Sequence, residues 1–191
     1  MPTKSSLDKV EALLNPTIEA TYDPQAMIAL VPIHNDEKVA DIGSGPGWLT
    51  IPLAKYLYSG KCYAVDVQEK MLDHVKEQAK KAGIGNIETV VSKENQVPMD
   101  DESLDGVVFS NVLNEASKPK TLLKEGARLL KKSGWLSIVE WFPVAEKPEF
   151  GPTPTYRLVQ QELREIVEGL GFTTLTSRQL TPHRYIIVAR K

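Results

Sequence analysis

Strand-like runs alternate with helical segments along most of this 191-residue chain, and the alternation limits the folds that it can adopt. Alternating β and α units predict a mainly parallel sheet with helices on both faces. The end of the chain departs from this pattern, because residues 172–178 and 184–189 are both strand-like and only a short turn separates them. Such a turn is too short for a parallel crossover. The last strand is therefore predicted to be antiparallel to its neighbour.

The predicted core is an α/β fold with a seven-stranded sheet, in which only the last strand is reversed. The strands are expected at residues 39–42, 61–67, 87–91, 104–110, 134–141, 172–178 and 184–189. The helices are expected at residues 48–57, 69–82, 118–130 and 158–169. A chain of this length fits one domain with a sizeable core, so residues 1–191 are expected to form a single domain.

Two segments are expected to lie outside the regular alternation. Residues 1–35 are predicted to form a helical lid segment in front of the core at residues 36–191. Residues 142–155 contain four prolines, which exclude a regular helix or a central strand. Long loops in compact domains are often functional lids. A loop that only crosses the end of the sheet is an equal alternative.

The charge and the cysteine content exclude several classes of protein. A net charge of -2 gives no sign of a nucleic-acid partner. The single cysteine, Cys62, forms no intrachain disulfide and lies in an apolar run, where burial in a strand is favoured over nucleophilic chemistry. The N-terminus lacks an apolar signal core, and no run reaches about 18 apolar residues. The sequence thus predicts a cytoplasmic protein with no membrane insertion.

A glycine-rich loop, "DIGSGPGWLT", follows the first predicted strand, at the edge where parallel sheets bind their ligands. A Walker phosphate loop needs a lysine and a hydroxyl residue after its last glycine, and Trp48 and Leu49 stand there instead. The dinucleotide pattern would require a glycine at Trp48. The loop therefore favours a ligand with an amino-acid end: N–H groups at the start of the helix can bind a carboxylate, and Asp41 can bind an ammonium group.

The second predicted strand ends at Asp66, about 20 residues beyond the loop, where an acidic group can accept hydrogen bonds from both ribose hydroxyls. Val67 and Met71 would then flank an adenine ring. The glycine loop and Asp66 together indicate an adenosine-containing ligand, and this much is shared by dinucleotides and S-adenosylmethionine.

Four segments in the same order resemble the motifs of class I S-adenosylmethionine-dependent methyltransferases with a Rossmann-like sheet, including those of the quinone-biosynthesis type. They are "VADIGSGPG", "AVDVQEKML", "VSKENQVPMDDESLDGVVFSNVLNEA" and the final "TPHRYIIVARK". The resemblance implies S-adenosyl-L-methionine as the cofactor. It implies contacts with the methionine moiety from Asp41, Gly43, Ser44, Gly45 and Gly47.

The resemblance also implies contacts at the two ends of the adenosine moiety. Lys93 occupies the position of an aspartate that often accepts a hydrogen bond from the adenine amino group. A lysine has no acceptor, so Lys93 departs from the family pattern, and Glu94 would contribute its side chain or its backbone N–H instead. Ser110 and Asn111, at the end of the fourth strand, should face the methyl-donor end.

No residue is identified as a catalytic base, because methyl transfer from an activated sulfonium needs mainly alignment, and a base only when the acceptor must lose a proton. The candidates are Asn111, Glu115 and Glu140, which follow the fourth strand or close the fifth. For Glu140, a solvated strand-end carboxylate is favoured over a substrate-facing one. The three histidines lack the spacing of metal ligands, so no metal is expected.

The sequence thus predicts a methyltransferase that transfers a methyl group to a small-molecule acceptor. The alternative is a catalytically silent protein that binds S-adenosylmethionine as a sensor or an assembly subunit, which the departure at Lys93 favours. An NAD-dependent oxidoreductase is the third possibility, and Trp48 opposes it. The sequence identifies neither the acceptor nor the oligomeric state.

Overall fold

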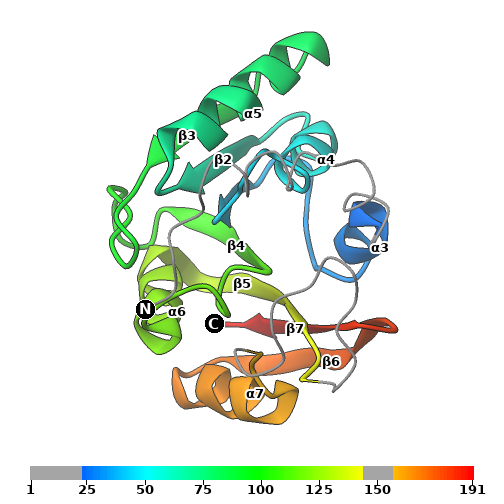
Figure 1. Cartoon of the computed structure of the whole chain (residues 1–191), viewed down its shortest axis with the longest axis vertical. Helices are drawn as coiled ribbons and strands as arrows, with labels where there is room; N and C mark the ends of the chain where they lie inside the picture. The colour runs from blue at the N-terminus through cyan, green and yellow to red at the C-terminus, as the bar shows by residue number, and fades with distance from the viewer. Residues whose placement is uncertain (1–22, 144–156) are drawn as a thin grey trace.

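The computed structural model describes residues 23–143 and 157–191, which form a seven-stranded sheet in the order β3-β2-β1-β4-β5-β7-β6 (Figure 1). The strands are β1 (Lys38–Ile42), β2 (Lys61–Asp66), β3 (Ile87–Val91), β4 (Leu104–Ser110), β5 (Leu130–Trp141), β6 (Thr173–Thr181) and β7 (Arg184–Arg190). The pairs are parallel except those of β7, which is antiparallel to both β5 and β6. The predicted Rossmann-like α/β fold is confirmed.

Five helices are found in the described part of the chain, and most bounds lie close to the predicted ones. They are α3 (Pro24–Ile28), α4 (Thr50–Tyr56), α5 (Glu69–Lys81), α6 (Pro119–Leu129) and α7 (Gln160–Gly169). Helix α4 begins two residues later than predicted, because the turns of the glycine loop continue through Leu49. Strand β5 begins four residues earlier than predicted, because Leu130 pairs with Leu104 of β4.

Helices cover both faces of the sheet because successive strand residues point to opposite sides. In the central strand β4, Val107 and Phe109 pack on the face covered by α6 and α7, where Leu123 belongs to the same apolar cluster. Val108, between them, packs on the other face with Leu53 of α4 and residues of α3. All five side chains are buried. The two apolar layers hold the sheet rigidly, so its carboxyl edge is a fixed platform for a site.

The strand order reverses at the centre of this edge. The chain passes from β1 outward through β2 to β3, and then returns to pair β4 with the other side of β1. In open α/β sheets, ligands bind outside the carboxyl ends of the strands at such a reversal. The loops after β1 and β4 are therefore the expected walls of the site.

The segments expected to act as lids fall largely on residues 1–22 and 144–156, which are outside the described residues. Within the described part, Met27 and Ile28 of α3 are buried against the sheet. Both lid assignments remain predictions. Cys62 is a buried free cysteine in β2, as predicted, and burial raises the pKa of its thiol well above the usual range. None of the described helices is long and apolar enough to span a membrane.

Candidate active site at the carboxyl edge of the sheet

The glycine loop is tied to the end of β2 by its own backbone. The amides of Gly43 and Ser44 both donate to the carbonyl of Val65, at 2.8 and 3.0 Å. The next amide, of Gly45, donates to Oδ2 of Asp66 at 2.9 Å. The loop and the acidic strand end, which the sequence predicts to share one ligand, are therefore in direct contact.

Glycine is required in this loop for two different reasons. Gly43, Gly45 and Gly47 have φ of +75°, +52° and +96°, a region that L side chains adopt only with strain. At Gly43 the space is also filled, because a Cβ would lie 2.3 Å from Cγ2 of Val112. At Gly45 a Cβ would meet no described atom within 4 Å. The backbone of Gly45 thus borders open space that a ligand can approach.

Asp41, in β1 two residues before Gly43, has a buried carboxyl group whose two oxygens differ in their contacts. Its exposed fraction is 1%. Oδ2 accepts a hydrogen bond from Oγ1 of Thr50 at 2.7 Å, while Oδ1 has no partner within residues 23–143 and 157–191. Burial raises the pKa of Asp41 to about 7, against the lowering effect of the Thr50 hydroxyl. Ser44 Oγ is likewise buried without a described partner. Buried acceptors usually have a donor, so both oxygens are candidates for contact with a bound ligand.

The raised pKa of Asp41 predicts a specific pH dependence of stability for the ligand-free protein. Between about pH 4 and pH 7 the folded state keeps the Asp41 proton and the unfolded state has lost it, so the free energy of unfolding falls as pH rises. Asp41→Asn should remove up to about 1.4 kcal/mol per pH unit of this slope. Urea unfolding at several pH values measures it. Parallel curves for the two proteins would contradict the assignment.

Asp66, the expected ribose ligand, is also largely buried. It is 7% exposed, and its Oδ1 accepts from the backbone N–H of Gln68 at 2.9 Å. Burial raises its pKa, and the negative charge of Glu115 raises it further, although three backbone hydrogen bonds oppose the shift. Of the two residues expected to flank adenine, Val67 is 46% exposed beside Asp66, and Met71 is buried.

Lys93 and Glu94 lie on an exposed turn after β3. The amide of Lys93 donates to Gln96 O at 3.0 Å, and the Gln96 amide donates back to Lys93 O at 3.2 Å. Glu94 accepts a hydrogen bond from the backbone N–H of Ser117. Asn95, at the same turn, has a buried Oδ1 with no described partner. The turn therefore offers a buried acceptor at a residue that the sequence motifs do not single out.

The candidates after β4 occupy different environments. Ser110 and Asn111 are half-buried at the strand end, and Asn111 has φ of +55°. Glu115 is exposed. Glu140 is completely buried and accepts hydrogen bonds from the backbone N–H groups of Leu113 and Asn114. The interpretation of Glu140 as a solvated carboxylate is wrong, because the loop after β4 folds over the end of β5.

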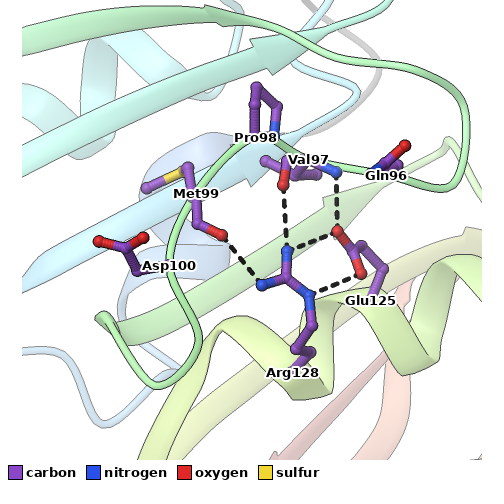
Figure 2. Close-up of a pocket in the computed structure, with 7 residues that line it drawn as sticks. All are labelled: Gln96, Val97, Pro98, Met99, Asp100, Glu125 and Arg128. Carbon is purple, nitrogen blue, oxygen red and sulfur yellow. Dashed lines mark hydrogen bonds and ion pairs between the residues drawn. The ribbon is translucent and has the colours of Figure 1, made fainter.

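The loop between β3 and β4 is fastened to α6 on the outer side by Arg128, within a surface hollow (Figure 2). The guanidinium donates to the carbonyls of Val97 and Met99 and to the carboxylates of Asp101 and Glu125. Glu125 in turn accepts from the amide of Val97 at 2.7 Å. All five N–H donors of Arg128 are used in these hydrogen bonds. The residues of the hollow therefore have a structural role, which is to hold the loop after β3 against α6.

Replacing Arg128 should therefore loosen the loop after β3. Arg128→Ala leaves the carboxylate of Glu125 and two backbone carbonyls without this donor, so we expect a loss of about 2 kcal/mol in the free energy of unfolding. Chemical denaturation measures the loss. Lys76→Ala is the matched control, because it removes an exposed ion pair with Asp73 and should change stability by less than about 0.5 kcal/mol. Equal losses of stability in the two variants would contradict the role of Arg128 in holding this loop to α6.

Several contributors to the site had no clear signal in the sequence. Thr50 donates to Asp41, Val112 packs on Gly43, and Asn95 places a buried oxygen in the turn after β3, and these arrangements exist only in the folded chain. The position of Thr50 within the helix after the glycine loop was the one available hint. No group of three or more metal-binding side chains is found among the residues described.

A buried carboxyl, an open glycine turn and a second acidic strand end at a topological reversal define a cofactor-binding α/β domain. Residues 40–138 match the family model described as "Methyltransferase domain", and the chain belongs to this family. Family membership implies S-adenosylmethionine as the cofactor, as the resemblance in the sequence does. Oδ1 of Asp41, which has no described partner, and the open face of Gly45 fit a cationic group beside the loop.

Individual relatives agree with this assignment. The ubiquinone/menaquinone biosynthesis C-methyltransferase UbiE of Cronobacter sakazakii is 30% identical over 63% of this chain and 47% of its own length. The chain thus spans about half the length of this relative. A SAM-dependent methyltransferase from Aquifex aeolicus has a similar structure, with a TM-score of 0.89, 28% identity, and coverage of 98% of this chain and 99% of that one.

The fold is also shared with a protein named for a different reaction. The [4+2]-cyclase SpnF has a TM-score of 0.77 and 15% identity, with coverage of 88% of this chain and 80% of its own. At that identity the likeness concerns the fold alone. The reaction must therefore be argued from the residues of the site.

Proposed function

We propose that this protein is an S-adenosylmethionine-dependent methyltransferase that acts on a small-molecule acceptor. The observation that carries the proposal is the presence of two buried carboxyls, Asp41 and Asp66, at the ends of adjacent strands, with Asp66 hydrogen-bonded to the open backbone of Gly45. Oδ1 of Asp41 would accept a hydrogen bond from the ammonium group of the cofactor. Asp66 would accept hydrogen bonds from the ribose hydroxyls, and Gly45 would let the ligand approach the backbone.

The residues of the chain would act mainly by alignment. When bound, S-adenosylmethionine supplies a methyl group that its sulfonium already activates. Ser110 and Asn111, at the end of β4, would border the space where an acceptor meets that methyl group. Alignment can supply a large part of the rate, and a base is needed only for an acceptor that must lose a proton. Asn111 and Glu115 remain the candidate catalytic residues, because the third candidate, Glu140, has no exposed surface with which to touch an acceptor.

The class of acceptor is supported by charge and by the relatives. A net charge of -2 favours a small molecule over a nucleic acid. The curated relatives are named for ubiquinone and menaquinone biosynthesis, so quinols and phenols are the first acceptors to test. The absence of a recognised base fits carbon or oxygen acceptors that lose their proton readily.

A catalytically silent cofactor-binding protein is the second candidate, and the departure at Lys93 favours it. Lys93 is exposed and cannot supply the acceptor that the family often places there. A sensor or an assembly subunit would keep the contacts of Asp41 and Asp66 and need no acceptor site. The two candidates therefore differ in turnover and share binding.

One experiment separates these possibilities. The protein is titrated with S-adenosylhomocysteine by calorimetry, and is then incubated with S-adenosylmethionine and a panel of quinols, phenols, amines and thiols. We expect binding, together with acceptor-dependent formation of S-adenosylhomocysteine. Binding without product from any acceptor supports the silent candidate. No binding of either compound contradicts both.

A further inference from the structure

Glu140, at the end of β5, accepts several hydrogen bonds from the loop that follows β4. Its side chain has no exposed surface. Oε1 accepts from the backbone N–H of Leu113 at 2.8 Å and from that of Asn114 at 3.3 Å, and Oε2 accepts from Nδ2 of Asn114. Three donors from two consecutive loop residues therefore converge on one carboxyl group.

The same loop reaches the cofactor-binding turn on its other side. Val112, the neighbour of Leu113, packs on Gly43 so closely that a Cβ there would lie 2.3 Å from Cγ2 of Val112. The loop consequently spans the distance between Glu140 and the glycine loop. A shift of Leu113 or Asn114 must move Val112, which is the wall of the glycine loop at Gly43.

The start of the loop is held in an unusual conformation. Asn111 has φ of +55°, and its backbone N–H donates to Val139 O of β5 at 2.8 Å. Its Oδ1 accepts from Nε of Arg184 at 3.2 Å, and the guanidinium of Arg184 stacks on Trp141, with its Cζ 3.7 Å from the ring centroid. Both β5 and β7 therefore contribute to holding the loop at the carboxyl edge of the sheet.

Burying a carboxyl group in this position costs free energy. Burial raises the pKa of Glu140 to about 7, despite the hydrogen bonds that it accepts. A buried carboxylate costs free energy unless hydrogen bonds compensate it, and such groups gather at functional sites. On the opposite face of β5, Ser137 is also buried and polar, and its hydroxyl contacts Sδ of Met27 at 3.8 Å. Glu140 differs from Ser137 in that its partners adjoin Val112, which packs on the glycine loop.

We propose that Glu140 is a positioning residue, whose carboxylate fixes the loop from Asn111 to Asn114 against Gly43 and thereby shapes the methyl end of the cofactor cleft. The proposal rests on the proposed function, because it assigns that cleft to S-adenosylmethionine. Glu140 acts through the loop, so it is separate from any group that touches the acceptor.

Glu140→Met tests this role, because the unbranched thioether side chain has a similar length and is at most a weak acceptor. The backbone N–H groups of Leu113 and Asn114 and Nδ2 of Asn114 then lose their acceptor. We expect hydrogen exchange at the amides of Leu113 and Asn114 to accelerate at least tenfold. Binding of S-adenosylhomocysteine, measured by calorimetry, should weaken about tenfold.

Two further variants separate positioning from general stability. Glu140→Gln is the rescue variant: its Oε1 can accept from the backbone N–H groups, and its amide N–H can donate to Oδ1 of Asn114 once the Asn114 amide turns over, so both readouts should stay near the wild type. Ser137→Ala removes a buried polar group from the same strand, and it should leave both readouts unchanged even where it lowers the melting temperature.

The outcomes are distinct. Unchanged exchange and binding in Glu140→Met, or an equal loss of binding in Ser137→Ala, would overturn the positioning role. Loss of both readouts in Glu140→Gln while its melting temperature matches the wild type would also overturn it. If the wild type does not bind S-adenosylhomocysteine, the proposed function fails and the cleft assignment falls with it, while exchange at Leu113 and Asn114 still reports whether Glu140 holds the loop.

Discussion

Asp66→Ala is expected to weaken binding of S-adenosylhomocysteine about 100-fold, a loss of about 2.7 kcal/mol. In the folded protein one oxygen of Asp66 accepts from the amide of Gly45 at 2.9 Å, and the other accepts from that of Gln68 at 2.9 Å. Alanine would therefore remove the acceptors for the ribose hydroxyls and also release the glycine loop. Hydrogen bonds to a charged group contribute about 1.5–3 kcal/mol, which sets the size of the effect. Calorimetry measures it.

Asp73→Ala provides the matched control for this prediction. Asp73 is an exposed carboxylate on α5 that pairs with Lys76 at 2.9 Å, so its loss should leave binding within about twofold. Wild-type affinity in Asp66→Ala would show that the ribose lies elsewhere. The same titration with NADH, followed by its fluorescence, tests the oxidoreductase alternative, and no change is expected.

The fold could be predicted from local sequence patterns because each pattern permits only one geometry of the chain. The short turn before Arg184 can only join antiparallel strands, and the structure has β7 reversed against both neighbours. Boundaries were less predictable where a distant strand decides them. Leu130 becomes extended because it pairs with Leu104, and nothing near Leu130 in the sequence indicates that partner.

One side of the candidate site is formed by the continuous segment of residues 41–66, and this side could be predicted from the sequence. Asp41 and Asp66 lie at the ends of two adjacent strands and Gly45 follows the first of them, so their spacing in the sequence is enough to bring them together. The other side depends on which loop covers which strand end. Glu140 looks like any strand-end glutamate until Leu113 and Asn114 fold over it, and that contact joins residues far apart in the chain.

Gly45→Val is expected to reduce binding of S-adenosylhomocysteine at least 100-fold. With φ of +52°, a β-branched residue at this position is strained, which should cost about 1–2 kcal/mol of stability. No atom of the described residues lies within 4 Å of the new Cβ, so the valine would occupy the open space that the proposed cofactor needs. The loss of binding should therefore greatly exceed what the loss of stability explains.

Gly83→Val isolates the backbone strain from the blocked space. Gly83 has φ of +66° and lies after α5, away from the glycine loop, and a Cβ added there would also meet no described atom within 4 Å. Both variants should lose similar stability in denaturant, because the same left-handed conformation is strained in each. Only Gly45→Val should lose binding. Equal affinities in the two variants would mean that the cofactor does not approach Gly45, and the arrangement of Asp41 and Asp66 around an open backbone would need another ligand.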